Sequence, residues 1–195
     1  MSINLEQIKE LREKTAVSIA ECKAALEQTS GDIEKAIIVL RKRGLETANR
    51  KSQRETKEGI IAFYVHTNKK VGALLELFCE TDFVAKNADF EALGKDLAMQ
   101  VVAANPKAVK PEDISQEEME QEENIYREQL EKSGKPAEIV EKALQGKISK
   151  FREENALLTQ PFIKDPGRKV DDVIKETISK VGENIQVGRF CRFQI

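Results

Sequence analysis

Hydrophobic positions in the first forty-five residues recur at helical spacing, in three short stripes separated by polar turns. The third stripe begins after Ser30-Gly31-Asp32, where Ser30 or Asp32 offers a capping oxygen, and Gly44 stands where helices often end. The pattern predicts a compact three-helix domain over residues 1–45. Its apolar positions are Leu5, Ile8, Leu11, Ile19, Cys22, Ala25, Leu26, Ile33, Ala36, Ile37 and Leu40.

The chain changes character after this domain. Arg41 to Lys57 holds seven basic residues against two acidic ones, with almost no apolar residue after Leu45. Such a run is typical of a solvated connector, and it is also the stretch of this sequence best suited to nucleic acid, although interleaved aromatic residues are missing. We therefore predict a basic linker over residues 46–57. A helical extension of the preceding domain is one form that this linker could take.

The hydrophobic period then changes to two. Residues 59–66 are rich in β-branched and aromatic side chains, residues 67–70 are polar, and residues 71–79 form a second apolar run. Two such runs around a short polar loop predict a β-hairpin. Residues 185–195 alternate again and predict a third strand.

Helical spacing returns between the hairpin and the last strand. The signals that start or stop these helices are, in order, Asn105-Pro106, the capping box Ser115-Gln116-Glu117-Glu118, Pro136, Pro166-Gly167 and Gly182. We therefore predict an α+β core over residues 58–195, in which helices pack on a three-stranded antiparallel sheet.

Composition narrows the function classes. The 195 residues are 40% hydrophobic and 34% charged, with a net charge of −2, as in an ordinary soluble protein. No long apolar run and no secretory signal is visible, so we expect a cytoplasmic protein without membrane contact or direct nucleic-acid binding. The widely spaced Cys22, Cys79 and Cys191 favour reduced thiols over disulfides or a metal site.

The sequence contains no evident catalytic constellation. His66 is the single histidine, and a lone histidine at a strand end is more typical of a structural role. Neither a GxxxxGK[ST] loop nor a GxGxxG motif occurs. The nine acidic residues between Glu112 and Lys132 are typical of a solvated helix face. The sequence therefore indicates a protein that is not an enzyme and has no cofactor.

One segment is less ordinary. The second strand leads into Thr81-Asp82-Phe83-Val84, a polar turn that carries an aromatic residue and precedes a helix. One interpretation is that Asp82 caps the helix and Phe83 folds back into the core. The other is that Phe83 is presented to a partner.

Residues 81–85 resemble the TDFVA motif of bacterial elongation factor Ts, the nucleotide-exchange factor of elongation factor Tu. Further stretches resemble this family in the same order over nearly the whole chain: residues 11–15, 22–26, 31–37, 72–81, 160–165, 182–185 and 189–190. The chain resembles the short form of the family, which has one core half where longer members have two.

The resemblance implies a guanine-nucleotide exchange factor of translation elongation that binds elongation factor Tu in its GDP-bound and nucleotide-free forms. It also implies that the first domain is of the ubiquitin-associated type and docks on the partner, while the turn disturbs the partner's magnesium and phosphate site. The contact residues, carried over by position, would be Thr81, Asp82, Phe83 and Val84 in the turn and Arg12, Ile19 and Lys23 in the helical domain.

The sequence departs from the family in the helical domain. Residues 16–20 read Ala-Val-Ser-Ile-Ala where the family has a glycine-rich turn and two methionines. Ile19 keeps an apolar side chain, but Ala20 is much smaller than methionine. Any contact that this surface makes with the partner is therefore expected to be thinner.

The resemblance further implies a homodimer, because short members of the family pair to supply the missing half. Apolar residues on both faces of the three predicted strands support this, and Cys191 would then lie near the two-fold axis. Two rival hypotheses remain open. One is a non-catalytic adaptor whose ubiquitin-associated-like domain binds another protein, and the other is a nucleic-acid binder that uses residues 41–57.

Overall fold

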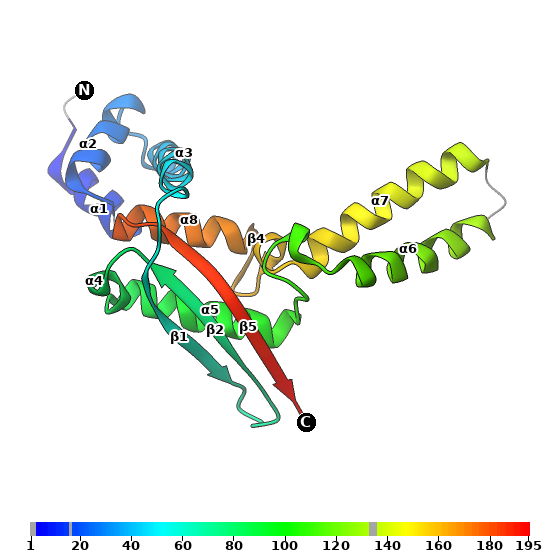
Figure 1. Cartoon of the computed structure of the whole chain (residues 1–195). Coiled ribbons are helices and arrows are strands. Elements are labelled where there is room, and N and C mark those ends of the chain that lie inside the picture. The colour runs from blue at the N-terminus through cyan, green and yellow to red at the C-terminus, as the bar shows by residue number, and fades with distance from the viewer. Residues whose placement is uncertain (1–2, 16, 133–135) are drawn as a thin grey trace. The chain divides into compact units, whose positions relative to one another are not determined.

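The structure is a computed structural model that describes residues 3–15, 17–132 and 136–195. It confirms the predicted α+β class (Figure 1). In chain order the elements are α1 (Leu5–Thr15), α2 (Ile19–Gln28), α3 (Ile33–Lys51), β1 (Glu58–Val65), β2 (Val71–Cys79), α4 (Asp82–Ala85), α5 (Ala88–Ala104), η1 (Pro111–Asp113), α6 (Gln116–Glu131), α7 (Ala137–Asn155), η2 (Leu157–Thr159), β3 (Pro161–Phe162), β4 (Asp165–Lys169), α8 (Val170–Val181) and β5 (Ile185–Gln194). Within the described residues, no helix is both long and apolar enough to cross a membrane.

The three predicted N-terminal helices are present and close a core of their own. Leu11, Cys22 and Leu26 have no exposed surface in this cluster. Of the two cap oxygens that the sequence offers before α3, the structure uses Asp32, whose carboxylate accepts a hydrogen bond from the Lys35 amide at 3.0 Å. Most predicted positions of the stripes face this core, but Leu5 and Ile19, the first residues of α1 and α2, are exposed, so the prediction is wrong for these two.

The helix end predicted at Gly44 is wrong, because α3 continues to Lys51. Gly44 is buried within the helix and does not have a positive φ. A Cβ atom at Gly44 would lie 3.2 Å from Ser179 Oγ of α8, so this glycine allows a close approach of two helices and does not end one. The stretch predicted as a linker thus begins inside α3, and only residues 52–57 connect α3 to β1. The division of the chain into domains at this stretch stays a prediction.

The strands β1, β2 and β5 form the predicted sheet in the order β1-β2-β5, so the last strand pairs with the second. The Ile195 amide donates to the Lys70 carbonyl at 2.9 Å, which places the end of the chain beside the start of β2. On one face, Arg192 Nε of β5 donates to the Val102 carbonyl of α5 at 3.1 Å. This face is the one that α5 covers.

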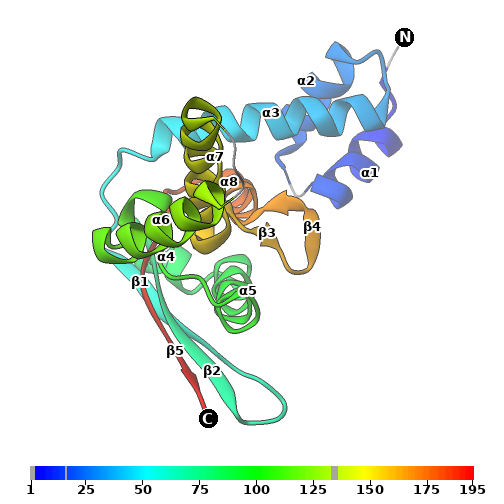
Figure 2. The same ribbon diagram turned by 90° about the vertical axis from the view of Figure 1, so that its right-hand side faces the viewer.

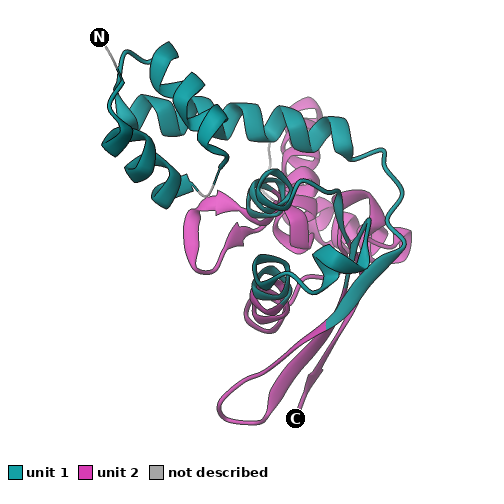
Figure 3. Cartoon of the chain, turned by 90° about the vertical axis from the view of Figure 1, so that its left-hand side faces the viewer, with its two compact units in different colours: residues 1–61, 77–94, 172–186 teal, residues 62–76, 95–171, 187–195 magenta. Residues whose placement is uncertain are grey.

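The described chain forms two compact units (Figure 3). Unit 1 consists of Met1–Ile61, Leu77–Gly94 and Asp172–Gln186, and unit 2 consists of Ala62–Glu76, Lys95–Asp171 and Val187–Ile195. In unit 2, α6 and α7 lie side by side as a helical hairpin (Figures 1 and 2). The residues that join the two helices are Leu130, Val140 and Leu144.

A second, two-stranded sheet in unit 2 was not predicted. The strands β3 and β4 pair antiparallel, and β3 is only two residues long. The buried side chain of Gln100 in α5 holds this hairpin, since it donates to the Pro161 carbonyl at 3.1 Å and accepts from the Ile163 amide at 2.8 Å. A strand so short leaves no alternating pattern in the sequence.

The N-terminal helical core provides a matched test of packing within one helix. We expect Leu11→Ala to lower the free energy of unfolding by about 2–5 kcal/mol, because it opens a cavity in a fully buried site. Leu5→Ala in the same helix should change it by less than about 0.5 kcal/mol, because Leu5 is 72% exposed. Urea unfolding of both variants measures the difference, and equal losses would contradict the described core.

Candidate partner-binding turn

The segment that follows β2 begins with a capped turn of helix. Cys79 ends the strand with its side chain buried, and Thr81 has extended backbone angles. The Thr81 hydroxyl accepts a hydrogen bond from the Val84 amide at 3.5 Å and so caps α4. Thr81, not Asp82, is therefore the N-cap, and the interpretation in which Asp82 caps the helix does not describe this structure.

The four residues Thr81–Val84, which we call the contact turn, are divided between an inner and an outer side. Val84 is buried together with Ala85, whereas Phe83 is 82% exposed, the most exposed aromatic side chain among the described residues. A helix turns by about 100° per residue, so burying Val84 directs the preceding Phe83 outward. The aromatic ring is consequently part of the surface and not of the core.

Asp82 faces solvent on the same turn. Its carboxylate pairs with Lys86 Nζ at 2.8 Å, one helical turn away. The hydrogen bond and charge of Lys86 hold the pKa of Asp82 below its usual value. The contact turn therefore presents an ionised carboxylate beside an exposed aromatic ring at neutral pH.

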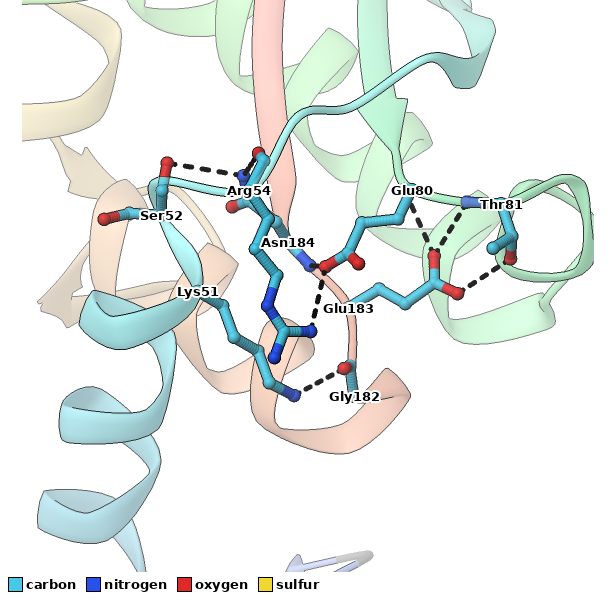
Figure 4. Close-up of polar contacts among 8 residues, drawn as sticks. All are labelled: Lys51, Ser52, Arg54, Glu80, Thr81, Gly182, Glu183 and Asn184. Carbon is cyan, nitrogen blue, oxygen red and sulfur yellow. Dashed lines mark hydrogen bonds and ion pairs between the residues drawn. The ribbon is translucent and has the colours of Figure 1, made fainter.

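A carboxylate from a distant part of the chain anchors the turn (Figure 4). Glu183 Oε2 accepts hydrogen bonds from the amides of Glu80 and Thr81 at 3.1 and 3.0 Å. Its other oxygen accepts from Thr81 Oγ1 at 2.7 Å. Three donors at the start of α4 thus converge on one side chain that follows α8.

The same short segment also contacts the end of α3 (Figure 4). Asn184 is buried, and its side-chain amide donates to the carbonyls of Arg54 and Ser52 at 2.7 and 3.5 Å. Lys51 Nζ donates to the Gly182 carbonyl. We call Gly182–Asn184 the clasp, because the contact turn and the residues after α3 both bind to it.

Glu80 closes the network between these two sides. One of its carboxylate oxygens accepts from the backbone amide of Asn184 at 2.6 Å and lies 3.5 Å from Arg54 Nη1. Gly182 has a φ of +80°, and its amide donates to the Ile178 carbonyl at 2.9 Å, so it ends α8 in the left-handed region. A side chain at this position would strain the turn that delivers Glu183.

The residues that the resemblance assigned to the helical domain lie on its surface. Arg12 is exposed on α1, and Ile19 and Lys23 are exposed one helical turn apart on α2. Exposure of Ile19 to 56% leaves its apolar side chain available for contact. Position 16, the first residue of the stretch that departs from the family, lies outside the described residues. The role of Arg12, Ile19 and Lys23 in binding stays a prediction.

Other candidate chemistry is sparse in the described part of the chain. Among these residues, no group of three or more His, Cys, Asp and Glu side chains could hold a metal ion. His66 Nδ1 lies 3.1 Å from the Tyr64 hydroxyl at the exposed end of β1.

Resemblance to the family locates the contact turn in the sequence but not the residues that hold it. Glu183 and Asn184 belong to a stretch that resembles the family, and the sequence gives them no role. The signal that could have pointed to them is their place directly after a helix-ending glycine, where a polar pair does not continue a core stripe. Their partners lie about a hundred positions away in sequence, as in the separation of 102 residues between Thr81 and Glu183.

The exposed ring of Phe83 on an anchored turn, together with the exposed apolar side chain of Ile19 on the N-terminal helices, is typical of the class of proteins that bind other macromolecules. The family model described as Elongation factor TS matches residues 4–195, and the chain belongs to this family. It is 55% identical to elongation factor Ts of Thermosipho melanesiensis over 99% of this chain and 98% of that protein. The elongation factor Ts of Thermodesulfovibrio yellowstonii is 53% identical over 100% and 97%, and that of Fervidobacterium nodosum is 50% identical over 100% and 99%.

The three cysteines should differ sharply in reactivity. Burial raises the pKa of the Cys79 thiol to about 11, with the nearby Glu183 carboxylate as a further cause, so it stays protonated at pH 8. Cys22 is also buried, whereas Cys191 is exposed. In the monomer, we expect a disulfide exchange reagent at pH 8 to modify one thiol quickly and the other two only on unfolding. Mass spectrometry of the labelled peptides would identify Cys191, and fast labelling at Cys79 would contradict the described packing.

Proposed function

We propose that this protein is a guanine-nucleotide exchange factor that binds elongation factor Tu and promotes release of GDP. The observation that carries the proposal is Phe83, an exposed ring on an anchored turn, in a chain of the elongation factor Ts family. The protein makes and breaks no covalent bond in this role. It acts by stabilising a form of its partner that holds nucleotide weakly.

The contact turn would be inserted beside the magnesium and phosphate region of the partner. Burial of a phenylalanine side chain is worth about 1.5–3 kcal/mol, which offsets the partner packing that is displaced. The ionised Asp82 adds like charge near the phosphates and so disfavours their return. Both effects act only when the turn is in place, which links them to exchange and not to docking.

Thermodynamic linkage relates the affinity of elongation factor Tu for GDP to its affinity for the factor. If the factor weakens GDP binding by a given ratio, GDP weakens binding of the factor by the same ratio. The factor must therefore bind nucleotide-free elongation factor Tu more tightly than the GDP complex. The exposed surface of the N-terminal helices, at Arg12, Ile19 and Lys23, would supply binding energy common to both complexes.

Phe83→Ala should slow catalysed GDP release about thirtyfold, because losing about 2 kcal/mol of aromatic contact corresponds to that factor at 1.4 kcal/mol per tenfold. The melting temperature should not change, because the ring is 82% exposed in the free protein. Release of a fluorescent GDP analogue from elongation factor Tu measures the rate, and a thermal melt on the same preparation measures stability. Asp82→Ala is the comparison variant and should slow release less, by under about fivefold. A Phe83→Ala protein that melts early yet exchanges normally would place the ring in the core.

We further propose that two copies of the chain pair through the sheet. In unit 2, Ala73 and Leu75 are buried on one face, while exposed apolar side chains share the other. The exposed set consists of Phe63, Val65, Leu74, Cys191, Phe193 and Ile195. A second copy offers a face of the same composition, and two such sheets pack at about 10 Å with their apolar sides together.

Phe193→Glu should abolish this pairing, because it would bury an unpaired charge between two apolar faces. We expect the wild-type chain to sediment as a dimer at roughly tens of micromolar and the variant as a monomer. Ile139→Glu is the matched control, since Ile139 is a similarly exposed apolar residue in α7 and not in the sheet. A wild-type chain that remains a monomer at this concentration contradicts the dimer.

A further inference from the structure

We propose that Glu183 is a positioning residue for nucleotide exchange, which holds the contact turn in the orientation that presents Phe83. The inference rests on the proposed function of that turn. Glu183 lies about a hundred positions away from the turn in sequence, and it would touch neither the nucleotide nor the partner's magnesium site.

The contact turn cannot hold its own shape. The helix α4 contains four residues, Asp82–Ala85, and a single helical turn is unfavourable in isolation because it fixes many backbone angles for one hydrogen bond. Its own cap is long, at 3.5 Å between the Val84 amide and Thr81 Oγ1. The orientation of Phe83 must therefore come from contacts outside the turn.

Burial of Val84 provides one such contact, and Glu183 provides the polar ones at the first residues of the turn. Its carboxylate accepts from two successive amides, at Glu80 and Thr81, and from the Thr81 hydroxyl at 2.7 Å. The hydroxyl hydrogen that points at Glu183 leaves the lone pairs of Thr81 Oγ1 available to the Val84 amide, so the carboxylate also orients the cap. Hydrogen bonds to an ionised acceptor are among the stronger ones in proteins.

The clasp also ties this anchor to the end of α3. Asn184 donates to the carbonyls of Arg54 and Ser52, and Glu80 accepts from the Asn184 amide at 2.6 Å. The clasp thus holds both the residues that follow α3 and the contact turn, through its neighbouring residues Asn184 and Glu183. When the N-terminal helices dock and the contact turn is inserted, the clasp would fix the position of one relative to the other.

The positioning role predicts a split between rate and affinity. Glu183→Ala should lower the GDP release rate at saturating factor about tenfold, the size expected from loss of a charge-assisted anchor. The factor concentration that gives half of the maximal effect should change by less than about twofold, because Phe83 and the helical surface remain. Glu183→Gln keeps one acceptor oxygen and should lie between the two proteins.

A spectroscopic measurement separates positioning from stability. The chain has no tryptophan, and the exposed site of Phe83 accepts a larger ring, so Phe83→Trp creates a single reporter on the turn. Time-resolved anisotropy of this reporter should show a larger fast component when Glu183→Ala is added, with overall tumbling unchanged. The measurement is made well below the melting temperature of both proteins, on the full chain and without the partner.

Two controls complete the test. Glu118→Gln changes another carboxylate that accepts from a helix-cap hydroxyl, that of Ser115 at 3.1 Å in unit 2, and should leave exchange and anisotropy unchanged. The double variant Thr81→Val, Glu183→Ala should release GDP at a rate within about twofold of that of Glu183→Ala alone, because both changes remove one shared contact.

A lower maximal rate with an enlarged fast anisotropy component supports the positioning role. An unchanged maximal rate, or a lower rate with unchanged anisotropy, overturns it. If the wild-type chain itself fails to accelerate GDP release, the proposed function is wrong, and the anisotropy alone then decides whether Glu183 holds the turn.

Discussion

The arrangement of the candidate site depends on one carboxylate that receives three hydrogen bonds. Glu183 binds the amides of Glu80 and Thr81 and the Thr81 hydroxyl, and a turn of only four residues needs such contacts in addition to the burial of Val84. The strength of such an anchor comes from its charge and from its several donors, which share one acceptor group. Such a support favours a defined orientation for the exposed aromatic ring of Phe83.

The clasp shows how a short segment serves several elements at once. Gly182 ends α8 with a positive φ, Glu183 and Asn184 turn to opposite partners, and Ile185 then begins β5. Each function uses a different atom of neighbouring residues, so the segment leaves little freedom for substitution. Burial of Asn184 raises the cost of any substitution there, because loss of its side-chain amide would leave the carbonyls after α3 without a donor.

Two exposed apolar surfaces set this molecule apart from an ordinary folded domain. One is the single ring of Phe83, and the other is the outward face of the sheet in unit 2, which includes Phe63 and Phe193. Isolated exposed apolar residues are common, but an aromatic residue on an anchored turn and several apolar side chains on one sheet face both have a cost in solubility. Binding of a partner or of a second copy would remove that cost, which is why both surfaces enter the proposed function.

Hydrophobic periodicity in the sequence determined the three N-terminal helices, the β-hairpin, the last strand and most helices of the core, because these elements bury one face and so repeat at 3.6 or 2 residues. Resemblance to a family located the contact turn at Thr81–Val84, which periodicity alone could not distinguish from a buried cap. The tertiary structure alone decided the rest. Gly44 proved to be a site of close helix approach, since the same residue type serves both roles. Glu183 and Asn184 found partners 102 and 130 positions away, at Thr81 and Arg54, and such side-chain contacts leave no periodic trace in the sequence because they depend on how the whole chain folds back on itself.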